Sequence, residues 1–277
     1  MRAHRITGGG GVGLHVTDQG SVDAPALLLI HGWAQDRDCW QKQAPLAATH
    51  RLITLDLRGH GQSDAPQVAE MYNDTAMWAA DINAIITALD LNKPILVGWS
   101  FGSRVIASYL DRFGDTAIAG VVLAGGVITT GKAREDWMVG PSSPGLNRDL
   151  YTEDDDLRAA ATAKFVRACT LDPLDDTLTA EIIAANMRVT ALVRRAIFAA
   201  NWDFRPVYAA LTKPLLAIHG VEDTVVAALC GITVSELAPK GDLRLYENTG
   251  HSPFVEQPER FNQDLTDFAT LTFGAAQ

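Results

Sequence analysis

Five short apolar runs, separated or followed by segments with helical spacing, constrain the fold of this chain more than any other feature. The runs cover residues 26–31, 51–57, 94–99, 119–124 and 214–219. A short run that is apolar throughout is typical of a strand buried on both faces. Helical periodicity predicts helices at 74–91, 101–113 and 258–271. Strands that alternate with helices favour an α/β fold, with a mostly parallel sheet covered by helices on both faces.

Further strand signals lie near the two ends of the chain. Residues 4–18 predict two short strands around Gly8–Gly11, and residues 243–247 predict a last strand, which brings the expected sheet to eight strands. The glycine run formally matches the G-x-G-x-x-G pattern of dinucleotide sites, but no adequate strand precedes it and no helix follows it. We therefore expect a hairpin turn there, and no cofactor.

The alternation of strands and helices stops between residues 128 and 212. This stretch has no convincing strand, and its periodicity predicts helices at 156–171, 176–187 and 190–200. The acidic run 153–156 suits a helix N-terminus, where carboxylates meet free N–H groups, and we expect it at the surface. The 277 residues thus predict a core formed by 1–127 and 213–277, with an inserted helical cap at 128–212.

One pentapeptide carries the strongest chemical signal. Gly98-Trp99-Ser100-Phe101-Gly102 fits G-x-S-x-G, and it follows a predicted strand and precedes a predicted helix. Such a turn strains its central residue and needs flanking glycines, because a Cβ atom there would meet neighbouring backbone. The turn would lift the Ser100 hydroxyl above the carboxyl edge of the sheet, so we predict that Ser100 is a catalytic nucleophile.

A serine hydroxyl needs a base at neutral pH, and that base needs an acid to orient it. His251 follows the last predicted strand, and Asp223 follows the strand that ends at residue 219. The chain order Ser100, Asp223, His251 is the order expected for this kind of turn. Glu222 and Asp242 are the rival acids. We expect Glu222 to point away from the site and Asp242 to lie at the wrong end of the sheet.

Two backbone amides are expected to stabilise the oxyanion that ester hydrolysis forms. Phe101 follows the nucleophile, and Gly32 lets the chain turn so that the Trp33 amide can be the second donor. Three further histidines, His31, His60 and His219, are expected to bind loop backbone and not to catalyse. Aromatic side chains are predicted to line an apolar acyl pocket: Trp33, Phe101, Trp137 and Phe254.

The charge balance narrows the choice of partners. The chain has 23 Lys and Arg against 33 Asp and Glu, a net charge of −10, and its densest basic spots are pairs such as Arg194-Arg195. Such a chain repels phosphate backbones and anionic membranes. We therefore expect no nucleic-acid partner, and a neutral ester is favoured over a polyanionic substrate.

Cysteine usage and apolar run lengths favour a cytoplasmic enzyme without metal or cofactor. Cys39, Cys169 and Cys230 are far apart and form no C-x-x-C, which argues against a disulfide framework or a zinc site. No apolar segment typical of a secretory signal follows Met1, and the longest apolar runs are far shorter than the ~20 residues that span a bilayer. No membrane partner is therefore expected, and a homodimer is compatible with the sequence.

Five motifs together resemble the α/β-hydrolase fold family. They are His31-Gly32-Trp33, Asp56-Leu57-Arg58-Gly59-His60-Gly61-Gln62-Ser63, the pentapeptide around Ser100, Gly220-Val221-Glu222-Asp223 and Gly250-His251-Ser252-Pro253-Phe254. The likeness covers residues 12–127 and 213–272. Within the family, the Gly-Trp-Ser and His-Gly-Trp segments are similar to those of carboxylesterases close to the pimeloyl-carrier esterases and the cofactor-free haloperoxidases. Ser103 departs from the pattern, since many members have a third small glycine there.

The residues and the resemblance imply a serine hydrolase that cleaves a small, fairly apolar carboxylic ester through an acyl-enzyme. Lactone hydrolysis, carbon–carbon bond hydrolysis and perhydrolysis with peroxide use the same site and stay open as alternatives. A cofactor-free lyase or oxygenase would use the serine and histidine for proton transfer only. A non-catalytic ligand receptor would usually lack a member of the triad, whereas all three are present here.

Overall fold

The computed structural model describes residues 1–274 and contains one eight-stranded sheet. Its strands are β1 (Arg2–Thr7), β2 (Gly13–Gln19), β3 (Ala26–Ile30), β4 (Arg51–Leu55), β5 (Ile95–Trp99), β6 (Gly120–Ala124), β7 (Leu215–Gly220) and β8 (Gly241–Tyr246). They lie in the order β1-β2-β4-β3-β5-β6-β7-β8. Strand β2 is antiparallel to both of its neighbours, and all other pairs are parallel. The predicted mostly parallel sheet is confirmed.

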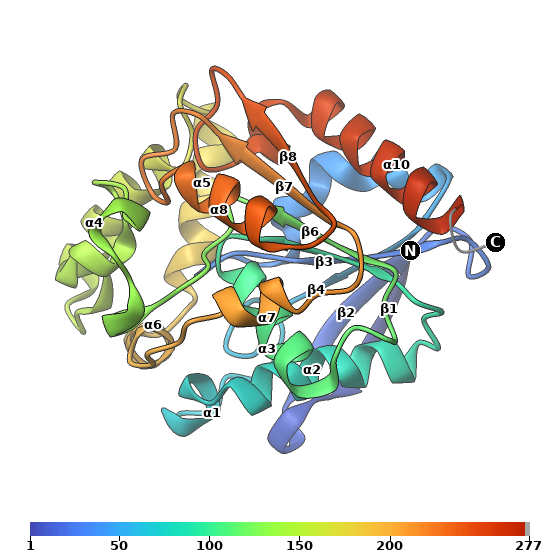
Figure 1. Ribbon diagram of the computed structural model, residues 1–277. Coiled ribbons are helices and arrows are strands. Elements are labelled where there is room, and N and C mark those ends of the chain that lie inside the picture. The colour runs from blue at the N-terminus through green and yellow to red at the C-terminus, as the bar shows by residue number, and fades with distance from the viewer. Residues whose placement is uncertain (275–277) are drawn as a thin grey trace.

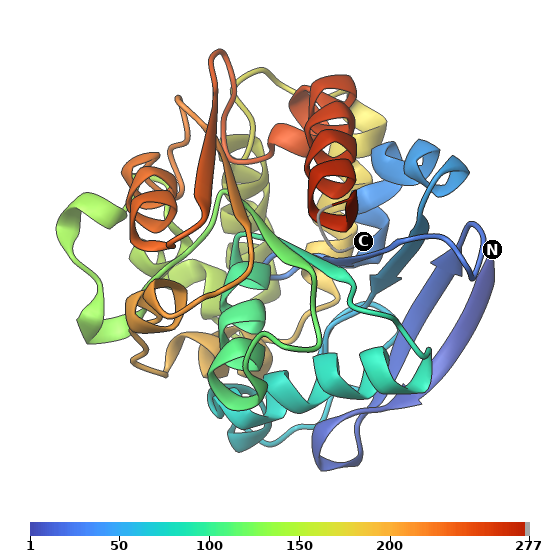
Figure 2. The same ribbon diagram turned by 45° about the vertical axis from the view of Figure 1, so that its right-hand side comes forward.

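The central strands are apolar throughout because both of their faces are covered. On β3, Leu28 and Ile30 belong to one apolar cluster, whereas Leu27 and Leu29 belong to the other. Figure 2 shows helices on opposite sides of the sheet, with α2 below it and α10 above it. The first layer contains α2 (Thr75–Ala88), α3 (Phe101–Phe113), α7 (Arg205–Ala209) and α8 (Leu229–Leu237), and the second contains η2 (Arg37–Ala48), α9 (Pro253–Glu256) and α10 (Pro258–Gly274).

A buried ion pair fixes the hairpin turn between β1 and β2. The turn contains the 3₁₀ segment η1 (Gly9–Gly11), in which the left-handed φ of Gly10, 64°, favours glycine. Gly9 N donates to Asp81 Oδ1 and Gly9 O accepts from Arg58 Nη2, both at 2.9 Å. Arg58 and Asp81 are themselves 2.6 Å apart and fully buried. The glycine run is thus a hairpin turn, as predicted.

The segment between β6 and β7 adds helices beyond the carboxyl ends of the parallel strands. Figure 1 shows them gathered at one end of the sheet, far from the N-terminus. They are α4 (Asp155–Ala168), α5 (Asp176–Met187) and α6 (Ala191–Phe198), preceded by the 3₁₀ turns η3 (Gly131–Ala133), η4 (Asp136–Met138), η5 (Pro144–Leu146) and η6 (Arg148–Tyr151). The Asp154 side chain accepts the amides of Asp156 and Leu157, so the acidic run starts α4 as expected. Helix α7 returns to the sheet, where the Tyr208 hydroxyl donates to Ser103 O at 2.8 Å.

The remaining helix, α1 (Glu70–Asn73), directly precedes α2. Helix α2 begins after Asp74, whose Oδ1 accepts the Ala76 amide at 2.8 Å. None of the helices within residues 1–274 is long and apolar enough to cross a membrane.

Candidate active site

The chain turns sharply between β5 and α3, and Ser100 lies at this turn. Its φ of 51° is in the left-handed region, which is strained for a residue with a side chain. The glycines on either side are required by space. A Cβ atom on Gly98 would lie 2.7 Å from the carbonyl carbon of Gly102, and one on Gly102 would lie 2.3 Å from Ile30 O. The predicted strand–serine–helix turn is therefore present.

Ser103 occupies the position of the third glycine and supports the turn from behind. Its hydroxyl lies 2.6 Å from Ser100 O and 3.0 Å from Val127 O, and it accepts the Val127 amide at 2.8 Å. Val127 lies between β6 and the first turn of the cap segment. The departure from the family pattern thus adds a hydrogen-bonded link between the Ser100 turn and the chain that leads to the cap.

Asp223 and His251 lie in the loops after β7 and β8, and their side chains meet. His251 Nδ1 donates to Asp223 Oδ2 at 2.7 Å, and both side chains are buried. Asp223 Oδ1 accepts the amides of Val225 and Val226 at 2.7 and 2.9 Å. Burial alone would raise the pKa of Asp223, but the charge and hydrogen bonds of His251 and His219 hold that pKa well below its usual range. Asp223 is therefore an ionised carboxylate at neutral pH.

His219 shares this carboxylate with His251, a contact that was not predicted from the sequence. Its Nε2 lies 3.0 Å from Asp223 Oδ2 and 3.0 Å from Val226 O. Both partners are acceptors, so the ring proton is assigned to Nε2. Nδ1 has no hydrogen-bond partner among residues 1–274. The expected backbone contact is present, but the ring also donates to the carboxylate. The four-residue spacing from His219 to Asp223 is the sequence signal that points to this contact.

His31 and His60 bind loop backbone, as predicted. His31 Nδ1 donates to Gly32 O at 2.8 Å, and its Nε2 accepts the Leu57 amide at 3.0 Å. His60 makes the same kind of pair with two other loop residues. Burial lowers the pKa of both rings, and lowers that of His60 to about 3. Both rings are therefore neutral structural groups at physiological pH.

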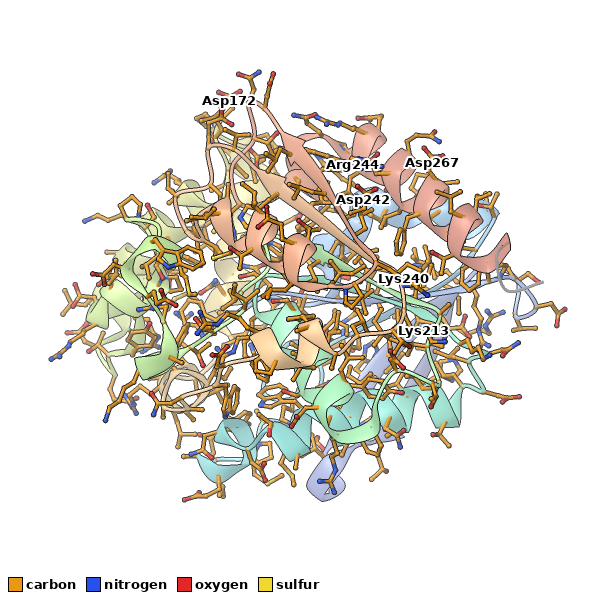
Figure 3. The ribbon with its side chains drawn as sticks, viewed as in Figure 1. Asp172, Lys213, Lys240, Asp242, Arg244 and Asp267 are labelled. Carbon is orange, nitrogen blue, oxygen red and sulfur yellow. The ribbon has the colours of Figure 1, made fainter. Side chains whose placement is uncertain are left out.

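The rival acids lie away from His251. Glu222 Oε2 accepts the Thr249 amide at 2.9 Å, which fixes its carboxylate in the adjoining loop. Asp242 lies in β8 and pairs with Arg244 at 2.8 Å. Figure 3 labels both residues on the edge strand β8, and Asp242 is the second residue of this strand, near the end opposite to the loop that holds His251. Neither carboxylate makes a hydrogen bond to the His251 ring within the described residues.

Ser100 and His251 line one cavity of about 480 Å³, whose walls come from the loops of the sheet and from the segment between β6 and β7. The predicted pocket residues Trp33, Phe101 and Phe254 also line it. The segment between β6 and β7 adds mainly apolar side chains, among them Met138, Phe165, Val166, Leu178, Ile182 and Phe198.

The prediction that Trp137 lines this cavity is wrong. The Trp137 indole N–H donates to Glu135 Oε2 at 2.8 Å on the exposed side of η4. Met138, the next residue in this tight turn, is 4% exposed and lines the cavity in its place. A 3₁₀-helix has three residues per turn, so consecutive side chains point in directions about 120° apart. Trp137 and Met138 therefore cannot both face the cavity.

Two backbone amides of residues in the cavity wall have no acceptor among the residues that the structure describes. Phe101 N is the first amide of α3, and Trp33 N follows the turn at Gly32. Neither donates a hydrogen bond within residues 1–274. A Cβ atom on Gly32 would lie 2.8 Å from the Trp99 ring, which explains why glycine stands there. Free amides of this kind can bind an anion that forms beside them.

Comparison with known proteins gives a consistent result. Residues 25–258 match the family model described as alpha/beta hydrolase fold. A non-heme chloroperoxidase of Streptomyces lividans is 28% identical over 282 residues, which cover 95% of this chain and 98% of the relative. A pimeloyl-[acyl-carrier protein] methyl ester esterase of Edwardsiella ictaluri (strain 93-146) is 27% identical over 255 residues, 88% of this chain and 92% of the relative.

Two solved structures are more similar in sequence. A putative aryl esterase from Burkholderia cenocepacia has a TM-score of 0.92 and 35% identity, covering 99% of this chain and all of its own. An esterase from Rhodococcus sp. ECU1013 has a TM-score of 0.93 and 33% identity, covering 98% of this chain and all of its own. The sheet order, the Ser100 turn and these matches lead to one conclusion. The chain belongs to the α/β-hydrolase fold family and has esterases among its relatives.

Proposed function

We propose that this protein is a serine hydrolase that cleaves a small, fairly apolar carboxylic ester through an acyl-enzyme. One observation carries the proposal: Ser100 and His251 line the same cavity, and His251 Nδ1 donates a hydrogen bond of 2.7 Å to Asp223 Oδ2. A serine at a strained turn, a histidine and a buried carboxylate are the three parts that this chemistry needs. The esterases among the relatives support the same reaction class.

In the proposed reaction, Ser100 Oγ attacks the carbonyl carbon of the ester while His251 Nε2 takes its proton. The oxyanion of the tetrahedral intermediate accepts hydrogen bonds from the Trp33 and Phe101 amides. The intermediate collapses, the alcohol leaves with the proton from His251, and the acyl group stays on Ser100. Asp223 keeps the other ring proton on Nδ1 and balances the imidazolium charge.

Water then completes the reaction. His251 takes a proton from a water molecule, and the hydroxide attacks the acyl carbon of the Ser100 ester. The second tetrahedral intermediate breaks down to the free acid and the serine hydroxyl, to which His251 returns the proton. The aromatic side chains of Trp33, Phe101 and Phe254 are proposed to bind the apolar part of the acyl group, because they line the cavity with Ser100.

The test replaces the nucleophile and a remote serine. Ser100→Ala should lower kcat on p-nitrophenyl butyrate by on the order of 10⁴-fold or more, since the acyl-enzyme cannot form. Ser235→Ala is the matched control, because Ser235 lies in α8 and its hydroxyl donates to Ile232 O. A fluorophosphonate should label the parent protein and the control but not Ser100→Ala. Retention of most ester turnover by Ser100→Ala would show that the assignment is wrong.

A fluorophosphonate result also separates the alternatives. A lyase or oxygenase that uses Ser100 only for proton transfer would turn over no ester and form no acyl-enzyme. Lactones, peroxide as a second nucleophile, and diketones for carbon–carbon cleavage belong in the same substrate panel, because they would use the same three residues.

A further inference from the structure

Three arginines in or beside the cavity wall have no carboxylate partner within residues 1–274. Arg104 and Arg134 line the cavity, and Arg194 packs over Trp33, which also lines it; none of the three forms an ion pair among these residues. The chain has ten more acidic than basic residues, 33 against 23, so partners are not scarce overall. An arginine buried without an anion carries a desolvation cost that a ligand anion would offset.

Arg104 is the least satisfied of the three. It is 2% exposed and lines the cavity. Its guanidinium carbon lies 4.9 Å from the centre of the Phe101 ring and 4.8 Å from that of Trp202, which holds the group in place. Among residues 1–274 its side chain makes one hydrogen bond, from Nη2 to Ile197 O at 3.2 Å, and its Nε is buried without a partner. A guanidinium has five N–H donors, so most of those of Arg104 have no acceptor in this part of the chain.

The neighbouring groups add to the positive potential. Arg134 also lines the cavity, and within the described part of the chain its side chain donates only to Ser143 Oγ, at a long 3.5 Å. The guanidinium carbon of Arg194 lies 5.3 Å from the centre of the Trp33 ring. Backbone carbonyls accept hydrogen bonds from this guanidinium but do not neutralise its positive charge. Burial and the charge of Arg134 lower the pKa of Arg104 to about 9, so the group is still protonated at neutral pH.

Three carboxylates line the cavity, those of Asp36, Asp38 and Glu181. Arg188 already neutralises Asp36 at 2.6 Å, and Asp38 lies beside Arg37, 3.7 Å away, and is mostly exposed. Glu181 is an exposed residue of α5. Within residues 1–274 none of the three forms an ion pair with Arg104 or Arg134.

The position of Arg104 sets the length of the ligand. Ser100 is the residue before α3 and Arg104 is the fourth residue of that helix, and both line the cavity, so a short ligand can contact both side chains. We propose that the natural substrate is an ester that carries a free carboxylate a few carbon atoms from the scissile carbonyl, and that Arg104, with Arg134, binds this carboxylate. This proposal rests on the proposed ester hydrolysis at Ser100. The proposed substrate is an anion, whereas the net charge of the chain favours a neutral ester. The net charge is a sum over the whole molecule and does not describe the local charge of the cavity.

The test compares esters in which a carboxylate stands in place of a terminal methyl group. Monomethyl glutarate carries the carboxylate on its acyl side, and its neutral reference is methyl pentanoate. 4-Acetoxybutanoate carries the carboxylate on its alcohol side, and its neutral reference is butyl acetate. A charge-assisted hydrogen bond predicts that one of the two anions has a kcat/KM about 10- to 100-fold above that of its neutral reference. In Arg104→Met this ratio should fall to near 1, and Arg104→Lys should recover part of it. Arg112→Met, an exposed arginine of the same helix, should keep the parent ratio.

A binding measurement separates this proposal from the proposed function. Calorimetry with Ser100→Ala, which cannot form the acyl-enzyme, should show the same preference for the anionic ester and the same loss on adding Arg104→Met. Equal or weaker binding and turnover of both anions relative to the neutral esters would overturn the carboxylate site, even if Ser100→Ala abolishes turnover. Conversely, ester turnover by Ser100→Ala would overturn the proposed function and leave the measured charge preference standing.

Discussion

Replacing Asp223 by asparagine tests both the triad and the four-donor environment of its carboxylate. Two backbone amides reach Oδ1, and the rings of His251 and His219 both reach Oδ2. A carboxylate can accept all four hydrogen bonds, but an amide has one acceptor oxygen and one donor group. If the asparagine oxygen serves the two backbone amides, its NH₂ group must face both histidine rings.

The NH₂ group has different effects on the two histidines. His251 can respond by accepting at Nδ1, which moves its proton to Nε2 and removes the lone pair that takes the serine proton. This wrong tautomer lowers kcat by on the order of 10⁴-fold. His219 keeps its bond to Val226 O but loses its bond to the carboxylate. A hydrogen bond to a charged group contributes about 1.5–3 kcal/mol, so we expect the free energy of unfolding to fall by at least that amount.

The assay is a double-mutant cycle between Asp223→Asn and His219→Leu, read by urea unfolding and by kcat on p-nitrophenyl butyrate. Without the His219 ring, the NH₂ group of asparagine meets only His251. The stability cost of Asp223→Asn should therefore be smaller in the His219→Leu background, by about 1–3 kcal/mol. Ser100→Ala, which removes activity but no partner of Asp223, is the control. Additive stability changes, or a kcat loss below tenfold in Asp223→Asn, would refute the reasoning.

Two other features give sharp predictions. Gly125 has a φ of 53°, and a Cβ atom there would lie 2.9 Å from His251 Nδ1. Gly125→Ala should therefore displace the ring and lower kcat at least tenfold, whereas Gly114→Ala, with a φ of 69° and open space around it, should show only the backbone strain of about 1 kcal/mol and an unchanged kcat. The buried His31 and His60 have lowered pKa values, so the unfolded chain binds protons that the folded protein does not as the pH falls below about 6.5. Their stabilising contribution is complete above that pH and is lost below it. From His60 alone, urea unfolding should give a free energy about 1 kcal/mol lower at pH 5 than at pH 6, and His31 lowers it further. A pH-independent free energy over this interval would contradict the assignment of both rings as neutral.

The Ser100 turn could be predicted because its geometry is local. The strain at Ser100 and the crowding of Gly98 against Gly102 follow from five consecutive residues and from the strand and helix on either side, whereas Gly102 is crowded by Ile30 O of the neighbouring strand β3. The strands could be predicted for a similar reason, since burial on both faces leaves an apolar run that is visible without any partner. The chain order of Asp223 and His251 and their places after strands predict both as partners of Ser100, and the structure brings their side chains together.

The direction of a single side chain could not be predicted, because tertiary packing decides it. Trp137 and Met138 are adjacent apolar residues in a short turn, and nothing local says which one faces the cavity. His219 reaches Asp223 across a turn whose shape depends on β8. Arg104 lies in a helix, where an arginine is usually exposed, and its burial follows from cap residues far away in the sequence.

The buried contact of the β1–β2 turn with Arg58 and Asp81 limits how far the chain can be shortened. The first strand is an edge strand with mostly exposed side chains, and on that ground alone it would be dispensable. Removing residues 1–12, however, would also remove both backbone groups of Gly9 that the ion pair contacts. The pair would then lose its cover at the point where α2 meets the loop after β4. A truncated protein should therefore lose more stability than the hairpin's own contacts supply, and the N-terminal segment acts as a cover for a charged core site.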